Sequence, residues 1–156
     1  PDEPWIIWVD TDYDADAIMA RIPEAVEVRG NMPPDVKEER LMSFVNGTTR
    51  ILVTKPSIAG MGLNLQHCAR MAFTGLSFSF ESYHQAVRRC WRFGQKNPVI
   101  VDIITTDGQE NVMANLQRKS DAAHIMFDNL VGMMWNELKI QKRNDYIQKE
   151  KVPAWL

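Results

Sequence analysis

Residues 5–9 read Trp-Ile-Ile-Trp-Val and are followed at once by Asp10, Thr11 and Asp12. A short run of β-branched and aromatic residues that ends in acids is typical of a strand buried on both faces and ending at a surface edge. Such strands belong to parallel sheets, because helices cover both faces of those sheets. The opening stretch therefore predicts an α/β protein with this segment inside the sheet.

Four further strands are predicted along the chain, and helices or long loops separate most of them. The strands cover residues 26–28, 50–54, 70–74 and 98–105, and the first helices cover residues 14–22 and 33–46. Parallel neighbours need a connection of a dozen or more residues, so this alternation indicates parallel β-α-β crossovers. The predicted fold is a three-layer α/β/α sandwich with a mostly parallel sheet.

The last third of the chain is predicted to be helical. After Gly108, apolar residues recur at helical spacing at Val112, Leu116, Ala123, Phe127, Leu130 and Met134. This continuous stripe is expected to pack on the domain. Residues 137–151 are dominated by charge and are expected to form an exposed helix or a fraying linker. We therefore divide the chain into a domain over 1–132 and a helical extension over 133–156.

Length and composition limit the classes of protein. The chain has 156 residues, 45% of them apolar and 24% charged, which is enough for one core but not for two ordinary domains. No apolar run approaches the roughly 20 residues of a membrane span, so no membrane partner is expected. The net charge of −2 does not by itself select a partner. The chain opens with Pro1 rather than Met, which suggests a piece of a longer protein.

The cysteines and histidines argue against a metal site. Cys68 and Cys90 form no CxxC pattern, and the three histidines share no metal-ligand spacing with them. We therefore expect no bound metal, no disulfide scaffold and a reducing, intracellular setting. A bacterial or phage-encoded cytoplasmic protein fits this expectation.

The most informative polar stretch covers residues 85–95 and reads Gln-Ala-Val-Arg-Arg-Cys-Trp-Arg-Phe-Gly-Gln. If it is helical, Gln85, Arg89 and Arg92 fall at i, i+4 and i+7 and share one face. Two guanidinium groups on a rigid helix suit a polyphosphate, because each offers a planar fork of donors that is always charged. A solvated face with incidental arginines is the alternative.

The same helical interpretation of residues 85–95 predicts an apolar face opposite the arginines. Ala86, Cys90 and Phe93 would occupy it and pack against the domain.

A glycine-containing stretch, Gly60-Met-Gly-Leu-Asn-Leu65, follows the strand over 50–54. Gly60 and Gly62 would let the backbone approach a ligand closely, and Asn64 could bond a ribose or a base edge. The third glycine of a dinucleotide fingerprint is missing, and no GxxxxGK[ST] phosphate loop occurs in the chain. This chain therefore does not carry a complete nucleotide site.

The order of these segments, from Trp5 to about Leu130, resembles the second RecA-like lobe of superfamily 2 helicases and translocases, which are P-loop NTPase-like enzymes. It is most similar to the Snf2-type branch. Residues 54–57 and 60–65 look like motif V, and residues 85–95 look like motif VI. Two departures occur in motif VI, where Arg88 and Trp91 stand where the Snf2 pattern usually has Asp and His.

This resemblance implies an ATP site shared with a first lobe. In such enzymes the first lobe carries the phosphate loop and the Mg²⁺-binding acids, and the second supplies arginine fingers. Arg89 and Arg92 match the finger positions, and Gln85 would help couple the γ-phosphate to the interface between the lobes. ATP with Mg²⁺ is therefore expected in the full protein, whereas the isolated chain should bind neither and be monomeric.

The resemblance also implies a nucleic-acid track along motif V. Thr54, Lys55 and Ser57 are the expected contacts to the phosphate backbone, and Gly60, Gly62 and Asn64 lie nearer the nucleotide. The expected partners are the N-terminal RecA-like lobe of the same polypeptide and DNA, with RNA as the alternative.

Two other function classes remain open from the residues alone. A nucleic-acid-binding or regulatory module could keep the RecA-like shape without supporting hydrolysis, although it would have no physical reason to keep Gln85, Arg89 and Arg92. A dinucleotide-binding enzyme would need a glycine-rich turn after residues 5–9, where Asp10, Thr11 and Asp12 stand.

Overall fold

The computed structural model divides the chain into two compact units, residues 1–114 and 115–156, and each is described here by itself. The structure describes residues 3–58, 63–75, 79–105 and 110–145, with the backbone alone for residues 110 and 134–145.

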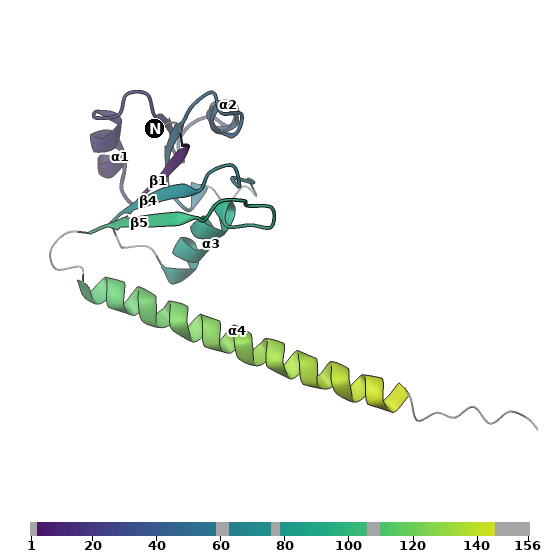
Figure 1. Cartoon of the computed structure of the whole chain (residues 1–156). Coiled ribbons are helices and arrows are strands. Elements are labelled where there is room, and N and C mark those ends of the chain that lie inside the picture. Colours follow the sequence, from purple (N-terminus) through teal and green to yellow (C-terminus); the bar gives the residue numbers. More distant parts are fainter. Residues whose placement is uncertain (1–2, 59–62, 76–78, 106–109, 146–156) are drawn as a thin grey trace, which may run out of the picture. The chain divides into compact units, whose positions relative to one another are not determined.

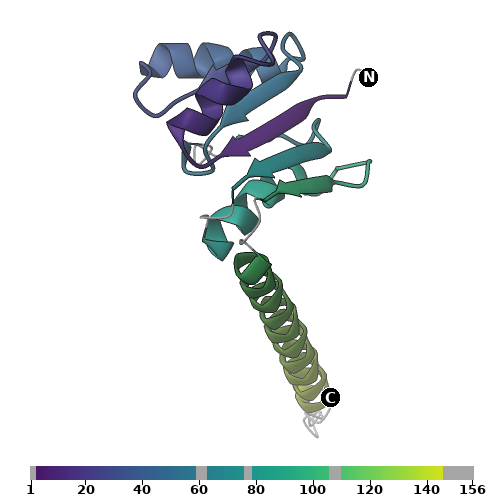
Figure 2. The ribbon, with the colours of Figure 1, turned by 90° about the vertical axis from the view of Figure 1, so that its left-hand side faces the viewer.

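The first unit is built on a five-stranded sheet in which every neighbouring pair is parallel. The strands are β1 (Trp5–Val9), β2 (Val26–Val28), β3 (Ile51–Thr54), β4 (Arg70–Thr74) and β5 (Ile100–Ile104). Their order across the sheet is β2-β3-β1-β4-β5, with β1 in the centre (Figure 1). Figure 2 shows the central strands running side by side. The parallel sheet predicted from the alternation of segments is thus confirmed.

Strand β5 (Ile100–Ile104) is shorter than the predicted range of 98–105. Pro98 has no backbone N–H and cannot donate to a ladder, so regular pairing begins beyond it. The first ladder bond of β5 runs from the Ile100 N–H to the Ala69 carbonyl, at 2.8 Å.

Three helices lie between strands along the chain and a fourth follows β5. They are α1 (Asp12–Met19), α2 (Pro34–Val45), α3 (Phe80–Cys90) and α4 (Glu110–Asp145). Side chains cap the starts of α1 and α3. Helix α1 begins two residues before the predicted start at Asp14, because Thr11 and Asp14 form a capping box. The Asp14 N–H donates to Thr11 Oγ1, and the Thr11 N–H donates to Asp14 Oδ2, both at 3.1 Å.

Replacing Thr11 by alanine is expected to lower the free energy of unfolding by about 1 kcal/mol, because the side-chain acceptor at the helix start is lost. Thr11→Ser keeps the hydroxyl and should stay close to the parent. Urea denaturation of the chain, followed by circular dichroism, measures both. An unchanged midpoint for Thr11→Ala would show that α1 does not depend on its cap.

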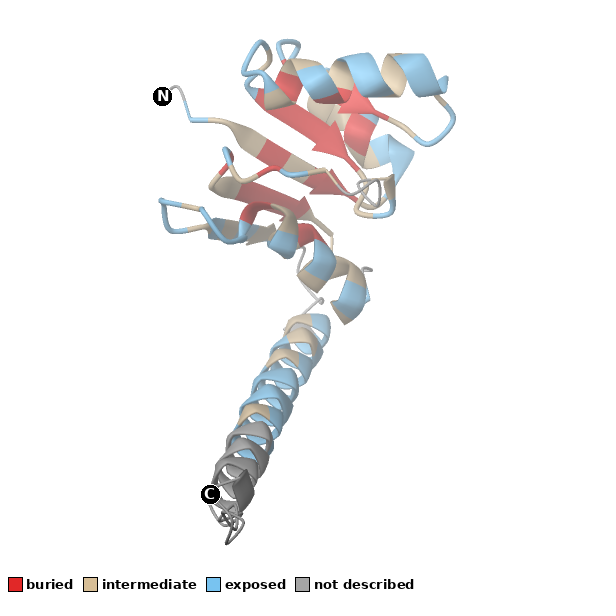
Figure 3. Ribbon diagram, turned by 90° about the vertical axis from the view of Figure 1, so that its right-hand side faces the viewer, coloured by how far each residue is buried: buried red, intermediate tan, exposed pale blue. Residues whose placement is uncertain are grey.

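Apolar side chains form one core on each face of the sheet. In β1, Ile6 and Trp8 face the core under α2 and α3, whereas Ile7 and Val9 face the core under α1. The larger core contains Ile6, Trp8, Val28, Leu41, Phe44, Leu52, Leu65, Cys68, Met71, Phe73, Ala86 and Cys90. Figure 3 shows the buried residues concentrated in the strands, with exposed residues on the outer sides of the helices. The predicted three-layer α/β/α sandwich is therefore confirmed.

Helix α4 runs without interruption for 36 residues. It carries a series of exposed large apolar side chains, namely Val112, Ile125, Met126, Phe127, Leu130 and Met133. The predicted continuous helix is confirmed, and its packing on the domain stays a prediction. The predicted boundary between residues 132 and 133 falls inside α4 and also stays a prediction. Within the residues that the structure describes, neither this helix nor any other is long and apolar enough to cross a membrane.

Candidate functional site

Helix α3 and the turn behind it position the arginines that the sequence singled out. Ser79 caps the start of the helix, and the helix ends at Cys90. Trp91 leaves helical geometry with a ψ of 82°, and Gly94 adopts a φ of +97° that favours glycine. The chain therefore turns sharply within four residues of the end of the helix.

This turn corrects two predictions made for residues 85–95. Arg92 lies on the turn rather than at position i+7 of a continuous helix. Phe93 was expected on the apolar face with Ala86 and Cys90, but it is fully exposed, whereas those two residues are buried. The physical reason is the early end of α3, because a residue beyond the last helical turn no longer follows the helical period.

The turn nevertheless brings Gln85, Arg89 and Arg92 together. All three line one shallow cavity of about 500 Å³, which is also lined by Arg88, Trp91 and Phe93. Three guanidinium groups share this cavity without a lining carboxylate, and no ion pair involves them in the described part of the chain. The Gln85 amide donates to Glu81 Oε1 at 3.1 Å, one helical turn away. The cavity can accept a group of high negative charge.

Sequence reasoning treated Arg88 and Trp91 only as departures from a family pattern, and thus missed them as part of this cavity. The signal that could have revealed the turn is Gly94, since glycine is favoured just beyond the end of a helix.

A second cavity, of about 320 Å³, lies at the carboxyl ends of β1 and β3. It contains Lys55 and Ser57, two of the residues expected to contact nucleic acid. The remaining lining residues are Val9, Asp10, Pro56, Ser79 and Ser82. In open parallel sheets, ligands bind beside this edge.

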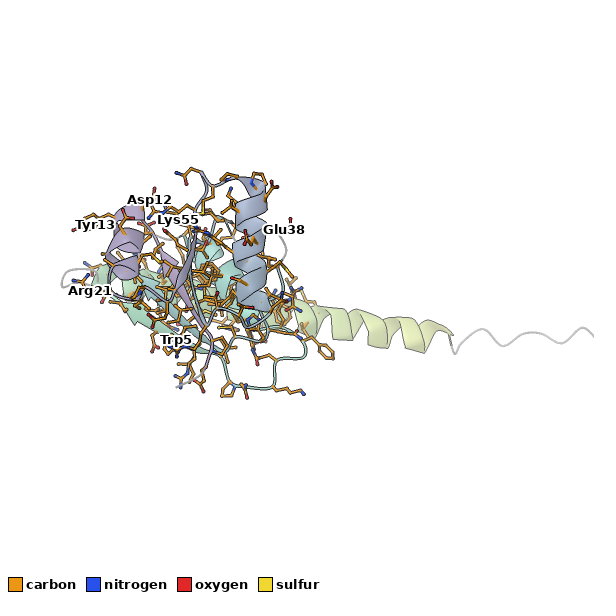
Figure 4. All side chains as sticks on the ribbon, turned by 90° about the horizontal axis from the view of Figure 1, so that it is seen from above. Trp5, Asp12, Tyr13, Arg21, Glu38 and Lys55 are labelled. Carbon is orange, nitrogen blue, oxygen red and sulfur yellow. The ribbon has the colours of Figure 1, made fainter. Side chains whose placement is uncertain are left out.

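Lys55 is already paired in this structure. Its Nζ lies 2.9 Å from Asp12 Oδ1 at the start of α1, and both residues are labelled in Figure 4. The hydrogen bond and the charge of Lys55 hold the pKa of the Asp12 carboxyl below its ordinary value. Because Asp12 is an exposed side chain, the pair is screened by water and contributes little to stability.

Ser79 and Ser82 were not identified from the sequence. Ser79 Oγ accepts from the Ser82 N–H at 3.1 Å and caps α3. The start of α3 therefore opens on the cavity that holds Lys55, where the helix dipole favours negative charge. The sequence did contain a signal for this cap, because serine is a preferred residue directly before the first residue of a helix.

The other predicted site residues lie apart from these cavities or outside the described residues. Thr54 is 2% exposed, and its hydroxyl donates to the Val28 carbonyl at 3.0 Å, so it ties β3 to β2. Asn64 is exposed, and its Oδ1 accepts from the Gln66 N–H at 3.2 Å. Gly60 and Gly62 lie outside the residues that the structure describes.

Arg29 is a cation that internal partners neutralise. Its guanidinium bonds Glu27 and Asp16, and these hydrogen bonds raise the pKa of Arg29 above its ordinary value. Arg29 is therefore not available to an external anion in the way that the cavity arginines are.

Cys68 and Cys90 are both free and buried. The hydrogen bond with Cys68, together with burial, raises the pKa of the Cys90 thiol. Across the described ranges, no group of three or more His, Cys, Asp or Glu side chains is placed to hold a metal ion.

Comparison with known proteins relates this geometry to a family. The family model described as "Helicase conserved C-terminal domain" matches residues 1–94. The chain is 29% identical over 119 residues to the pre-mRNA-splicing ATP-dependent RNA helicase prp28 of Aspergillus niger, covering 74% of the chain and 14% of that protein. The chain spans between 14% and 28% of the length of the curated relatives that it matches.

Two solved structures share the fold. The C-terminal part of the Fun30 ATPase domain is 20% identical with a TM-score of 0.60, and the match covers 73% of this chain and 39% of that one. The C-terminal domain of S. cerevisiae Dbp5, bound to Gle1 and IP6, is 14% identical with a TM-score of 0.64. That match covers 76% of this chain and 70% of that one.

Proposed function

The chain belongs to the family of helicase conserved C-terminal domains, and on that premise we propose that it is the second motor lobe of an ATP-dependent DNA helicase or translocase of the Snf2-type branch. Its role is to supply arginine fingers, and part of a nucleic-acid track, to an ATP site that it shares with a first lobe. Such a protein works inside the cell.

The observation that carries this proposal is the cavity in which Gln85, Arg89 and Arg92 meet. A guanidinium aimed at a transferring phosphoryl group stabilises the charge that spreads over its oxygens in the transition state. Arg89 and Arg92 are the groups for this role. Gln85 couples the γ-phosphate to the interface between the two lobes. Because the three arginines have no carboxylate partner in the described part of the chain, they are free to meet an anion from outside.

The residues present fit the polyphosphate of ATP but not its metal ion. Guanidinium and amide donors line the cavity, and among the side chains that the structure describes no carboxylate lines it that could hold Mg²⁺. The sequence also contains no GxxxxGK[ST] phosphate loop. Mg²⁺ and the phosphate loop therefore belong to the first lobe, and this chain completes the site from across the cleft.

The nucleic-acid track runs through the second cavity. Lys55 and Ser57 contact backbone phosphates there, and Ser79 and Ser82 place the start of α3 beside them. Thr54, which was expected to contact phosphate as well, is left out of this track, because it is 2% exposed and its hydroxyl donates to the Val28 carbonyl. Helix α3 has 11 residues and spans roughly 16 Å, so it links the track at its start to the arginine cavity at its end.

RNA is the second candidate substrate, because the curated relatives include a protein named as an RNA helicase. The resemblance of residues 85–95 to motif VI supports the Snf2-type branch and DNA, with Arg88 and Trp91 as departures from that pattern. The two candidates differ in which nucleic acid stimulates hydrolysis.

The intact protein is expected to hydrolyse ATP in response to nucleic acid, whereas the isolated chain should show no turnover. Lys55→Ala should raise the DNA concentration for half-maximal stimulation about tenfold and should lower the salt slope by about 1, because one phosphate contact is lost. Titrations with duplex DNA and with RNA, at several salt concentrations, measure these effects.

Lys37→Ala is the matched control, because Lys37 bonds the Gly30 carbonyl away from both cavities and should leave stimulation unchanged. Stronger stimulation by RNA would establish the second candidate. An intact protein that binds nucleic acid but hydrolyses no ATP would instead support a regulatory RecA-like module.

A further inference from the structure

The turn that carries Arg92 is closed by the side chain of Gln95. Its Nε2 donates to the carbonyl oxygens of Gln66, Cys68 and Cys90, at 2.8, 3.1 and 3.3 Å. An amide NH₂ has two hydrogens, so three acceptors occupy its full donor capacity with one hydrogen shared. One side chain therefore joins the segment before β4 to the end of α3.

We propose that Gln95 is a positioning residue that holds the Arg92 turn against the segment 64–68 and so sets where Arg92 stands in its cavity. This inference rests on the proposed function, because it assigns Gln95 a role in the work of Arg92.

The remaining polar groups of Gln95 also bind within the turn. Its Oε1 accepts from the Asn97 N–H at 3.0 Å, and its own N–H donates to the Arg92 carbonyl at 3.0 Å. The Arg92 N–H donates in turn to the Cys90 carbonyl at 3.1 Å. Gln95 therefore fixes the backbone on both sides of Arg92.

One further hydrogen bond and the surroundings of Gly94 also place the turn beside segment 64–68. The Leu65 N–H donates to the Arg89 carbonyl at 3.1 Å. A Cβ built on Gly94 would meet the Gln66 side-chain amide at 3.5 Å, and Gly94 has a φ of +97°. A backbone hydrogen bond thus joins segment 64–68 to the end of α3, in addition to the bonds that the Gln95 side chain makes.

Arg92 itself depends on this backbone. In the described residues its side chain makes no hydrogen bond or ion pair, so no other group orients it. A shift of the turn by about 1 Å would carry the guanidinium with it, and misplacement of that size can cost about 10²-fold in rate.

The chemistry of the amide makes the role testable. Gln95→Glu keeps the shape but presents acceptors to three carbonyl oxygens, and Gln95→Met keeps the length without any hydrogen bond. Asn97→Asp makes the same change from amide to carboxylate on an exposed side chain of the same turn, and is the matched control.

In the intact protein, Gln95→Glu and Gln95→Met are expected to lower kcat for ATP hydrolysis by about 10²-fold, because Arg92 is misplaced in the transition state. The KM for ATP should change less than about threefold, because ground-state binding is retained. Asn97→Asp should match the parent. A loss confined to KM, or an equal loss in Asn97→Asp, would overturn the inference.

A double-mutant cycle with Arg92→Ala separates positioning from a general structural role. If Gln95 acts through Arg92, then Gln95→Glu should cause no further loss of kcat in the Arg92→Ala protein. Additive losses would overturn the inference while leaving the proposed function intact.

Amide hydrogen exchange of the same proteins tests the positioning without any ATP. Exchange at Arg92 and Gln95 should be at least about tenfold faster in Gln95→Glu and unchanged in Asn97→Asp, because the turn is released. Unchanged exchange in Gln95→Glu would overturn the inference. Faster amide exchange in Gln95→Glu, combined with an Arg92→Ala protein of normal activity, would support the positioning role of Gln95 and overturn the proposed function instead.

Discussion

ATP turnover by the intact protein is expected to fall by about 10³-fold or more when Arg92 is replaced by alanine, while nucleotide affinity changes only a few-fold. A guanidinium that acts mainly as charge develops is used in the transition state, so its loss lowers turnover far more than ground-state binding. Arginine fingers in related NTPases contribute about 10³ to 10⁵ in rate. Single-turnover hydrolysis and nucleotide titration measure the two quantities separately.

Lysine at this position should not restore the rate. An ammonium group keeps the charge but lacks the planar fork of donors, so Arg92→Lys should stay strongly impaired. Arg21→Ala is the control, because Arg21 lies in the turn after α1, outside the arginine cavity, and donates to the Ala17 carbonyl. A well-folded Arg92→Ala protein with near-normal hydrolysis would refute the assignment of Arg92 as a finger.

Replacing Phe44 by alanine is expected to lower the free energy of unfolding by about 3 to 5 kcal/mol. Phe44 is 0% exposed in the core between α2 and the sheet, and its ring lies 4.9 Å from that of His67, centroid to centroid. Removal of the ring loses its burial and leaves a cavity in the larger core. Denaturant titration of the chain measures the loss.

Phe93→Ala is the matched control for Phe44→Ala. The same substitution at this fully exposed side chain should change the free energy of unfolding by less than about 0.5 kcal/mol. A large loss from Phe93→Ala would mean that the side chain packs as the helical pattern of residues 85–95 predicted. The two substitutions therefore test both the core and the corrected end of α3.

The sheet was predictable because its buried strands appear in the sequence as short runs of apolar residues. Residues 5–9, 26–28 and 70–74 coincide with β1, β2 and β4. Element ends were less predictable, because single side chains set them. Thr11 moved the start of α1, and the geometry of Trp91 ended α3 before Arg92.

The two cavities could be predicted only in part, since each joins segments through the fold rather than along the chain. The sequence identified Gln85, Arg89 and Arg92 as partners although the helical reason given for Arg92 was wrong. It could not place Ser79 and Ser82 beside Lys55, because the sheet order sets that proximity. The three carbonyl partners of Gln95 likewise belong to residues that a helical or strand period does not relate.

The ion pair between Lys55 and Asp12 has a consequence for nucleic-acid binding. Under the proposed function the chain carries its own competing anion, because a backbone phosphate at Lys55 would have to take the place of the Asp12 carboxylate. The apparent affinity is then the intrinsic affinity multiplied by the fraction of molecules in which Lys55 is free of Asp12. If the proposed function holds, this intramolecular exchange of partners would favour release of each backbone phosphate as well as its capture.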